Sequence, residues 1–192
     1  MDPINIIIGL NIIATFGANI GAAKKGVKDK LGISKDKPKT YLQTLPLYLS
    51  TITLAVLIVS LFQVGTLEYK MENQTLRIIG LVVYLTFSWI QIWATKVLGD
   101  NYSQDIVIKK DHHLITSGPF KFIRHPQYFS QFLLDTAGAV ATLSFVLAPL
   151  ALIQIPLLFL RASLEDKLLE KHFGENFRNY KKKSGMFFPF VG

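Results

Sequence analysis

The chain has 192 residues, half of them hydrophobic, and a formal net charge of +8 without any cysteine. A mean hydropathy of +0.34 indicates a membrane protein of one domain, and the lack of cysteine excludes disulfides and thiolate metal ligands, so we expect no metal site. The basic residues lie between long apolar runs, which favours a membrane surface over nucleic acid as the partner of the charge.

Three uncharged stretches are each about long enough to cross roughly 30 Å of hydrocarbon as a helix. They comprise residues 4–23, 45–65 and 78–95. The first lacks a basic region before it, so we expect it to remain as an anchor. Its Gly17 and Gly21 are one helical turn apart and permit close approach of another helix, which we expect within the chain rather than in a dimer.

Residues 127–160 contain a single charge, Asp135. This stretch is too long for one upright span and short for two, so it predicts a tight helical hairpin. Pro149 and Pro156 interrupt the helical pattern, and we place the turn at residues 144–149.

Lysine and arginine in short loops favour the cytoplasmic side of a membrane. Residues 24–39 carry seven lysines against two aspartates, residues 96–124 five basic against three acidic side chains, and residues 161–192 seven against four. Residues 66–75 carry one lysine against two glutamates. An all-α polytopic membrane protein with five transmembrane helices, the N-terminus outside and the C-terminus inside, places every basic segment in the cytoplasm.

The turn Arg124-His125-Pro126, just before the predicted fourth helix, places two side chains with hydrogen-bonding groups next to each other. Arginine offers a fork of donors, histidine accepts or donates, and proline keeps His125 out of helical geometry. The turn could therefore present both side chains to a ligand. The alternative is an interfacial pair that binds lipid phosphate.

A second polar segment follows the fifth predicted helix. Arg161 and Glu165 are one turn apart and share a helix face, and Glu165 with Asp166 could accept hydrogen bonds from a nucleoside ligand. The alternative is a solvated helix face. Residues 172–183 resemble an amphipathic helix with basic residues, which we assign to membrane anchoring.

Together these segments resemble the isoprenylcysteine carboxyl methyltransferase family and, through it, phospholipid methyltransferases. The resemblance covers roughly residues 76–190. We expect the chain to be one domain (1–192) that consists of two N-terminal spans (1–75) and a catalytic core (76–192). It rests on Leu98-Gly99-Asp100-Asn101-Tyr102-Ser103, His112, Leu114, Gly118, Arg124-His125-Pro126, Tyr128, Arg161, Glu165-Asp166, Phe173-Gly174 and Tyr180. Asp166, Tyr102 and Phe120 depart from the glutamate, tryptophan and tyrosine that the family usually has.

The resemblance implies that S-adenosylmethionine binds in a cytoplasm-facing loop roofed by a C-terminal helix. It implies carboxyl O-methylation of an isoprenylcysteine-type, lipid-like or prenylated acceptor that enters from the bilayer of a cell inner membrane or endoplasmic reticulum. Arg161 and Glu165 are then the catalytic residues, with Arg161 assigned to the acceptor. The cofactor-binding residues are His112, Leu114, Gly118, Arg124, His125, Pro126, Tyr128, Glu165 and Asp166.

Three other functions stay open from the sequence. One is N-methylation of a phospholipid or other lipid, which requires removal of a proton. The second is an NADPH-dependent sterol-type reductase, which has a similar arginine-histidine-proline turn, and the third is a non-catalytic scaffold that binds lipid. Asp135 is either functional or a hydrogen-bonded structural acid, and the oligomeric state is open.

Overall fold

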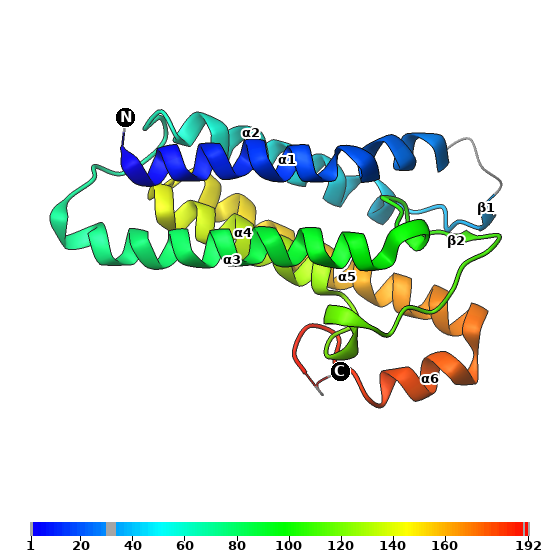
Figure 1. Ribbon diagram of the computed structural model, residues 1–192. Helices are drawn as coiled ribbons and strands as arrows, with labels where there is room; N and C mark the ends of the chain where they lie inside the picture. Colours follow the sequence, from blue (N-terminus) through cyan, green and yellow to red (C-terminus); the bar gives the residue numbers. More distant parts are fainter. Residues whose placement is uncertain (1, 30–33, 190, 192) are drawn as a thin grey trace.

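The computed structural model describes residues 2–29, 34–189 and 191. Figure 1 shows that the long helices form one bundle. They are α1 (Pro3–Asp29), α2 (Leu45–Ser60), α3 (Gln74–Leu98), α4 (Pro126–Thr142) and α5 (Leu147–Phe173), followed by the short α6 (Glu175–Lys181). Each predicted apolar stretch is therefore helical, and part of the lysine-rich segment 24–39 lies outside the described residues.

Short elements connect the helices. Four 3-10 helices are η1 (Tyr41–Gln43), η2 (Met71–Asn73), η3 (Gly99–Asn101) and η4 (Gly118–Lys121). Strands β1 (Ser34–Asp36) and β2 (Ile108–Lys109) pair antiparallel. This pairing joins the segment before α2 to the loop after α3.

Within the described residues, three helical stretches are long and apolar enough to cross a membrane. They comprise Tyr41–Ser60, Met71–Asn101 and Leu147–Phe173, and Pro3–Asn19 is a shorter apolar helix. The bundle is thus that of an integral membrane protein, and the count of five spans stays a prediction. Large side chains such as Leu10 and Ile13, 62% and 72% exposed, face outward, as expected where hydrocarbon surrounds the helices.

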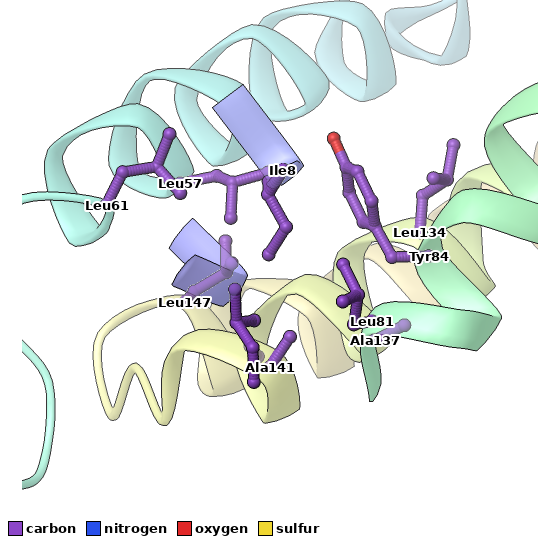
Figure 2. Close-up of a cluster of buried hydrophobic side chains, with 11 residues drawn as sticks. Ile8, Leu57, Leu61, Leu81, Tyr84, Leu134, Ala137, Ala141 and Leu147 are labelled. Atoms are coloured by element: carbon purple, nitrogen blue, oxygen red, sulfur yellow. The ribbon is translucent and has the colours of Figure 1, made fainter. Parts of the chain in front are cut away.

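Apolar side chains from all five long helices meet in one core. Figure 2 shows Ile8 of α1 close to Leu57 of α2, with the ring of Tyr84 from α3 beside Leu134 of α4. The closest approach is between α3 and α4 at Gly80, where an added Cβ would lie 2.8 Å from the Ala141 amide nitrogen. Small residues thus let these two backbones touch.

The close approach that we predicted at Gly17 is wrong. An added Cβ at Gly17 would have no neighbour within 4 Å, whereas at Gly9 it would lie 3.5 Å from the Leu61 side chain. Helix α1 therefore packs through its first half, and the packing around Gly21 lies outside what the structure describes.

The hairpin turns slightly earlier than predicted. Helix α4 ends at Thr142, and Leu143 adopts the left-handed conformation with φ 49°. The Ser144 hydroxyl then accepts from the Leu147 N–H at 3.1 Å and so caps α5. Pro149 lies in the first turn of α5 rather than in the connection, because the first amides of a helix need no intrahelical acceptor.

Opposite ends of the bundle carry different polar groups. The first residues, the α2–α3 connection and the hairpin turn lie at one end, whereas the α3–α4 loop and α6 lie at the other (Figure 1). At the first end Arg77 is 1% exposed and bonds Asp2 at 2.6 Å and the Ala141 carbonyl at 2.9 Å. This Arg77 hydrogen bond holds the pKa of Asp2 below its usual value.

Candidate active site

The turn before α4 positions Arg124 and His125. Pro126 is the first residue of α4, and His125 has φ −124° and ψ 58°, a non-helical conformation as expected before proline. The C-terminal segment holds the turn from the other side. The Arg124 N–H donates to the Gly185 carbonyl at 2.8 Å and the His125 N–H to the Met186 carbonyl at 3.2 Å.

Arg124, His125 and Asp166 form a buried cluster behind this turn. Arg124 Nε lies 3.0 Å from Asp166 Oδ2, and His125 Nε2 lies 2.8 Å from Oδ1. Because an ionised carboxylate only accepts hydrogen bonds, this contact assigns the His125 proton to Nε2. Nδ1 then remains an acceptor on the side of Glu165, whose Oε2 is 3.8 Å away.

Tyr128 connects Glu165 to Arg161. Its hydroxyl donates to Glu165 Oε2 at 2.7 Å and accepts from Arg161 Nε at 3.0 Å. Its ring stacks on the His125 imidazole with 5.4 Å between centroids and 10° between planes. The side chains of α4 and α5 thus fix each other at this level of the bundle.

Arg161 also binds main-chain carbonyls from two other segments. Nη1 donates to Leu42 at 2.6 Å and to Gln43 at 3.1 Å, and Nη2 donates to Gln104. The side chain is 3% exposed, and within the described residues no carboxylate forms an ion pair with it. A buried positive charge therefore stands beside the site, stabilised by neutral oxygens.

A cavity of about 480 Å³ opens between these side chains and extends into the bundle. Side chains from all five long helices line it, including Phe16 of α1, Leu54 of α2, Gln91 of α3, Gln131 of α4 and Leu158 of α5. We call the part between the helices, which Gln91, Gln131 and Leu158 line, the inner arm. The part that lies against the loop after α3 and against α6, which His112 and Phe177 line, is the outer arm.

The loop after α3 contributes polar groups that are shielded from water. Burial lowers the pKa of His112, an effect larger than the opposing charge of Glu165. His112 Nδ1 is buried and has no hydrogen-bond partner among the described residues. Burial likewise raises the pKa of Tyr102. The outer arm thus offers a neutral imidazole and an unsatisfied ring nitrogen to a ligand.

The structure brings most of the predicted site residues to this cavity. Its wall includes His112, Leu114, Arg124, His125, Pro126, Tyr128, Arg161 and Glu165. Gly118 and Asp166 do not line it. Gly118 has φ 59°, and its Cβ position lies 3.0 Å from the Val97 side chain, so it shapes the turn, whereas Asp166 holds Arg124 and His125 from behind.

Other cavity residues come from the C-terminal helix that was expected to roof the site, although we assigned none of its side chains to it. Phe177 and Tyr180 of α6 line the outer arm, and the Tyr180 hydroxyl donates to the Phe120 carbonyl at 2.6 Å. Burial raises the pKa of Tyr180 to about 12. Helix α6 is thus part of the cavity wall, besides any role in membrane anchoring. The aromatic spacing within residues 172–183 was the available signal.

The helical bundle is similar to a solved structure of the eukaryotic intramembrane Ras methyltransferase, isoprenylcysteine carboxyl methyltransferase. The likeness has a TM-score of 0.62 at 19% identity and covers 100% of this chain and 69% of that chain. At this identity the likeness establishes the fold.

Two curated relatives are named protein-S-isoprenylcysteine O-methyltransferase. The Saccharomyces cerevisiae protein is 25% identical over 131 residues, covering 65% of this chain and 53% of the relative. The Xenopus laevis protein is 30% identical over 123 residues, covering 60% of this chain and 41% of the relative. The chain thus spans about half the length of the curated relatives that it matches, or somewhat less.

The family model for isoprenylcysteine carboxyl methyltransferases matches residues 78–171. This range holds the Arg124-His125-Pro126 turn, Arg161 and the adjacent acids Glu165 and Asp166. Together with the fold, the match shows that this part of the chain is similar to the isoprenylcysteine carboxyl methyltransferase family.

Proposed function

We propose that the chain is an S-adenosylmethionine-dependent methyltransferase that methylates the carboxylate of an isoprenylcysteine-type acceptor at the membrane. The family match and the names of the relatives support this activity. The acceptor is lipid-like, so it reaches the cavity from the bilayer.

The residues of the outer arm fit a nucleoside-containing methyl donor. The volume of about 480 Å³ lies within the range of small-molecule sites. Glu165 and His125 Nδ1 offer acceptors, and the unpartnered His112 Nδ1 offers a further polar contact. S-adenosylmethionine supplies a methyl group on a sulfonium centre when bound. We assign its contacts to His112, Leu114, His125, Tyr128 and Glu165, with Gly118, Arg124, Pro126 and Asp166 shaping the site.

The charge of Arg161 is our reason for proposing a carboxylate rather than an amine as the methyl acceptor. Its buried charge has no carboxylate partner among the described residues, so it attracts an anionic group and repels a protonated amine. A carboxylate is ionised near neutral pH and needs no general base. The residues of the chain then have only to orient the acceptor and exclude water.

We also propose that the site faces the cytoplasm and that α1–α5 are five spans, in a cell inner membrane or in the endoplasmic reticulum. The α3–α4 loop and α6, which hold the site, belong to the lysine- and arginine-rich segments, and such segments favour the cytoplasmic side. The α2–α3 connection is the acidic one and lies at the opposite end of the bundle (Figure 1).

The test uses the full chain in lipid nanodiscs with S-adenosylmethionine that carries a labelled methyl group. N-Acetyl-S-farnesylcysteine and phosphatidylethanolamine serve as alternative acceptors. We expect an alkali-labile methyl ester on the first compound and no N-methyl product on the second. Labelled lipid amine would instead establish N-methylation, and calorimetric binding of NADPH without S-adenosylhomocysteine binding would establish a reductase.

A further inference from the structure

The inner arm contains a chain of polar side chains inside the helical bundle. Gln91 of α3 donates from Nε2 to Gln131 Oε1 of α4 at 2.9 Å. Gln131 Nε2 in turn lies 3.0 Å from Asp135 Oδ1 and 3.2 Å from Oδ2. Gln91 and Gln131 line the cavity, whereas Asp135 lies behind them and is 8% exposed.

The contacts with Asp135 set the direction of the hydrogen bonds in this series. Gln131 Nε2 lies within hydrogen-bond distance of both carboxyl oxygens of Asp135, so the Gln131 amide donates to Asp135 and its carbonyl oxygen faces away. The Gln131 carbonyl oxygen then faces Gln91 and requires the Gln91 nitrogen as its donor. Consequently the two amides cannot rotate independently. The carbonyl oxygen of Gln91 takes no part in this series of hydrogen bonds.

Gln91 Oε1 therefore remains as an acceptor at the cavity wall. Among the described residues no N–H or O–H group donates to it. Gln91 is half-buried on the cavity wall, so a ligand in the inner arm can reach this oxygen and supply a hydrogen-bond donor. An intramembrane acid such as Asp135 is costly without a function, and holding the two amides for such a ligand would be its function.

The position of the inner arm assigns this donor to the methyl acceptor. Tyr128, which bonds Arg161 at 3.0 Å, is three residues before Gln131 on α4, so the two side chains are neighbours on one helix face. Gln91 therefore lies near the place proposed for the acceptor carboxylate. In an isoprenylcysteine residue the amide nitrogen and the carboxyl group are attached to the same carbon.

We infer that Gln91 accepts a hydrogen bond from the amide N–H of the isoprenylcysteine acceptor, and that Gln131 and Asp135 hold the Gln91 amide in the orientation that this requires. The inference rests on the proposed function. Gln91 is a specificity-determining residue, whereas Gln131 and Asp135 are positioning residues.

The experiment compares two acceptors in nanodiscs. N-Acetyl-S-farnesylcysteine carries the amide, whereas 3-(farnesylthio)propionate has the same thioether and carboxylate without it. We expect kcat/KM of the intact protein to favour the amide compound about tenfold, since the second compound leaves Gln91 unpaired. In Gln91→Met the preference should fall close to one, and in Asp135→Asn it should fall partway, because asparagine can present either end to Gln131.

Gln154→Met is the matched control. Gln154 is a fully buried amide on α5 that donates to Ser50 and is not among the residues that line the cavity, so its loss should leave the preference unchanged. S-Adenosylhomocysteine affinity should stay constant in Gln91→Met. A preference that persists in Gln91→Met overturns the inference, and a weaker S-adenosylhomocysteine affinity there would assign Gln91 to the cofactor. Methylation of both compounds at equal rates by the intact protein refutes the inference alone, whereas methylation of neither refutes the proposed function as well.

Discussion

Glu165 and Asp166 are neighbours in the sequence but have different tasks. Successive side chains on an α-helix point about 100° apart, so Glu165 faces the cavity and Tyr128, whereas Asp166 faces Arg124 and His125. The sequence showed an acidic pair. Only the packing of α5 against the turn before α4 tells the two carboxylates apart.

Glu165→Gln should weaken S-adenosylhomocysteine binding roughly tenfold to hundredfold, because one charged hydrogen bond is worth about 1.5 to 3 kcal/mol. Isothermal titration calorimetry measures the change. Glu170→Gln makes the same substitution on the same helix, where Glu170 pairs with the exposed Arg178 away from the cavity, and it should bind normally. Equal affinities in both variants would remove Glu165 from the cofactor site.

His112 should make stability depend on pH. Because burial lowers its pKa below 6.5, the unfolded chain takes up a proton near pH 6.5 while the folded chain does not. The free energy of unfolding should therefore decrease as the pH falls below 6.5, by at most about 1.4 kcal/mol per pH unit. Unfolding midpoints of the intact protein and of His112→Gln, measured between pH 8 and pH 5, test this. A slope that is the same in both proteins would show that His112 does not contribute.

Among the elements, α3 and α4 make the contact that most needs a residue without a side chain, which is Gly80. A Cβ at Gly80 would lie 2.8 Å from one α4 backbone atom and 3.0 Å from another. Neither atom can move without displacing the helix. The α3–α4 spacing that positions Gln91 against Gln131 is thus set at the other end of the two helices.

Gly80→Ala should destabilise the fold by about 1 to 3 kcal/mol through overpacking. Gly17→Ala places the same methyl group on α1 where it meets no atom within 4 Å, and it should be neutral or stabilise by about 1 kcal/mol. Thermal unfolding in detergent compares the two variants. A Gly80→Ala protein as stable as the Gly17→Ala protein would contradict the tight contact.

The sequence predicts the long helices well because apolar length depends on local composition alone. It does less well where a polar group depends on a distant partner. Arg77 borders an apolar stretch and so resembles an interfacial arginine, yet it is buried against Asp2. The site shows the same division. The motif residues are visible in the sequence, whereas Phe177 and Gln91 reach the cavity only through the packing of their helices.

At the scale of the whole molecule, the two ends of the bundle hold different polar groups. Arg77 with Asp2 closes one end, and the cavity with its basic flanking segments occupies the other. We expect the two termini to lie on opposite sides of the membrane, with the C-terminal end in the cytoplasm.

Reporter fusions at both ends test this orientation. A cytoplasm-active reporter should work at the C-terminus and fail at the N-terminus, and a reporter that is active outside the cytoplasm should give the reverse. If both ends report from the cytoplasm, the orientation is wrong and the number of spans is even.

The hydrogen bonds of Arg161 to Leu42 and Gln43 use only main-chain oxygens. This joint between the N-terminal helices and the half that holds the site does not depend on the side chain at position 42, whereas the Gln43 side chain adds two hydrogen bonds to the main chain of Ile106, each of 2.8 Å. Over evolution, α1 and α2 can thus diverge and remodel one wall of the inner arm as long as Gln43 is kept. Chimeric proteins that exchange these two helices between relatives should therefore assemble, and they offer a direct route to altered acceptor preference.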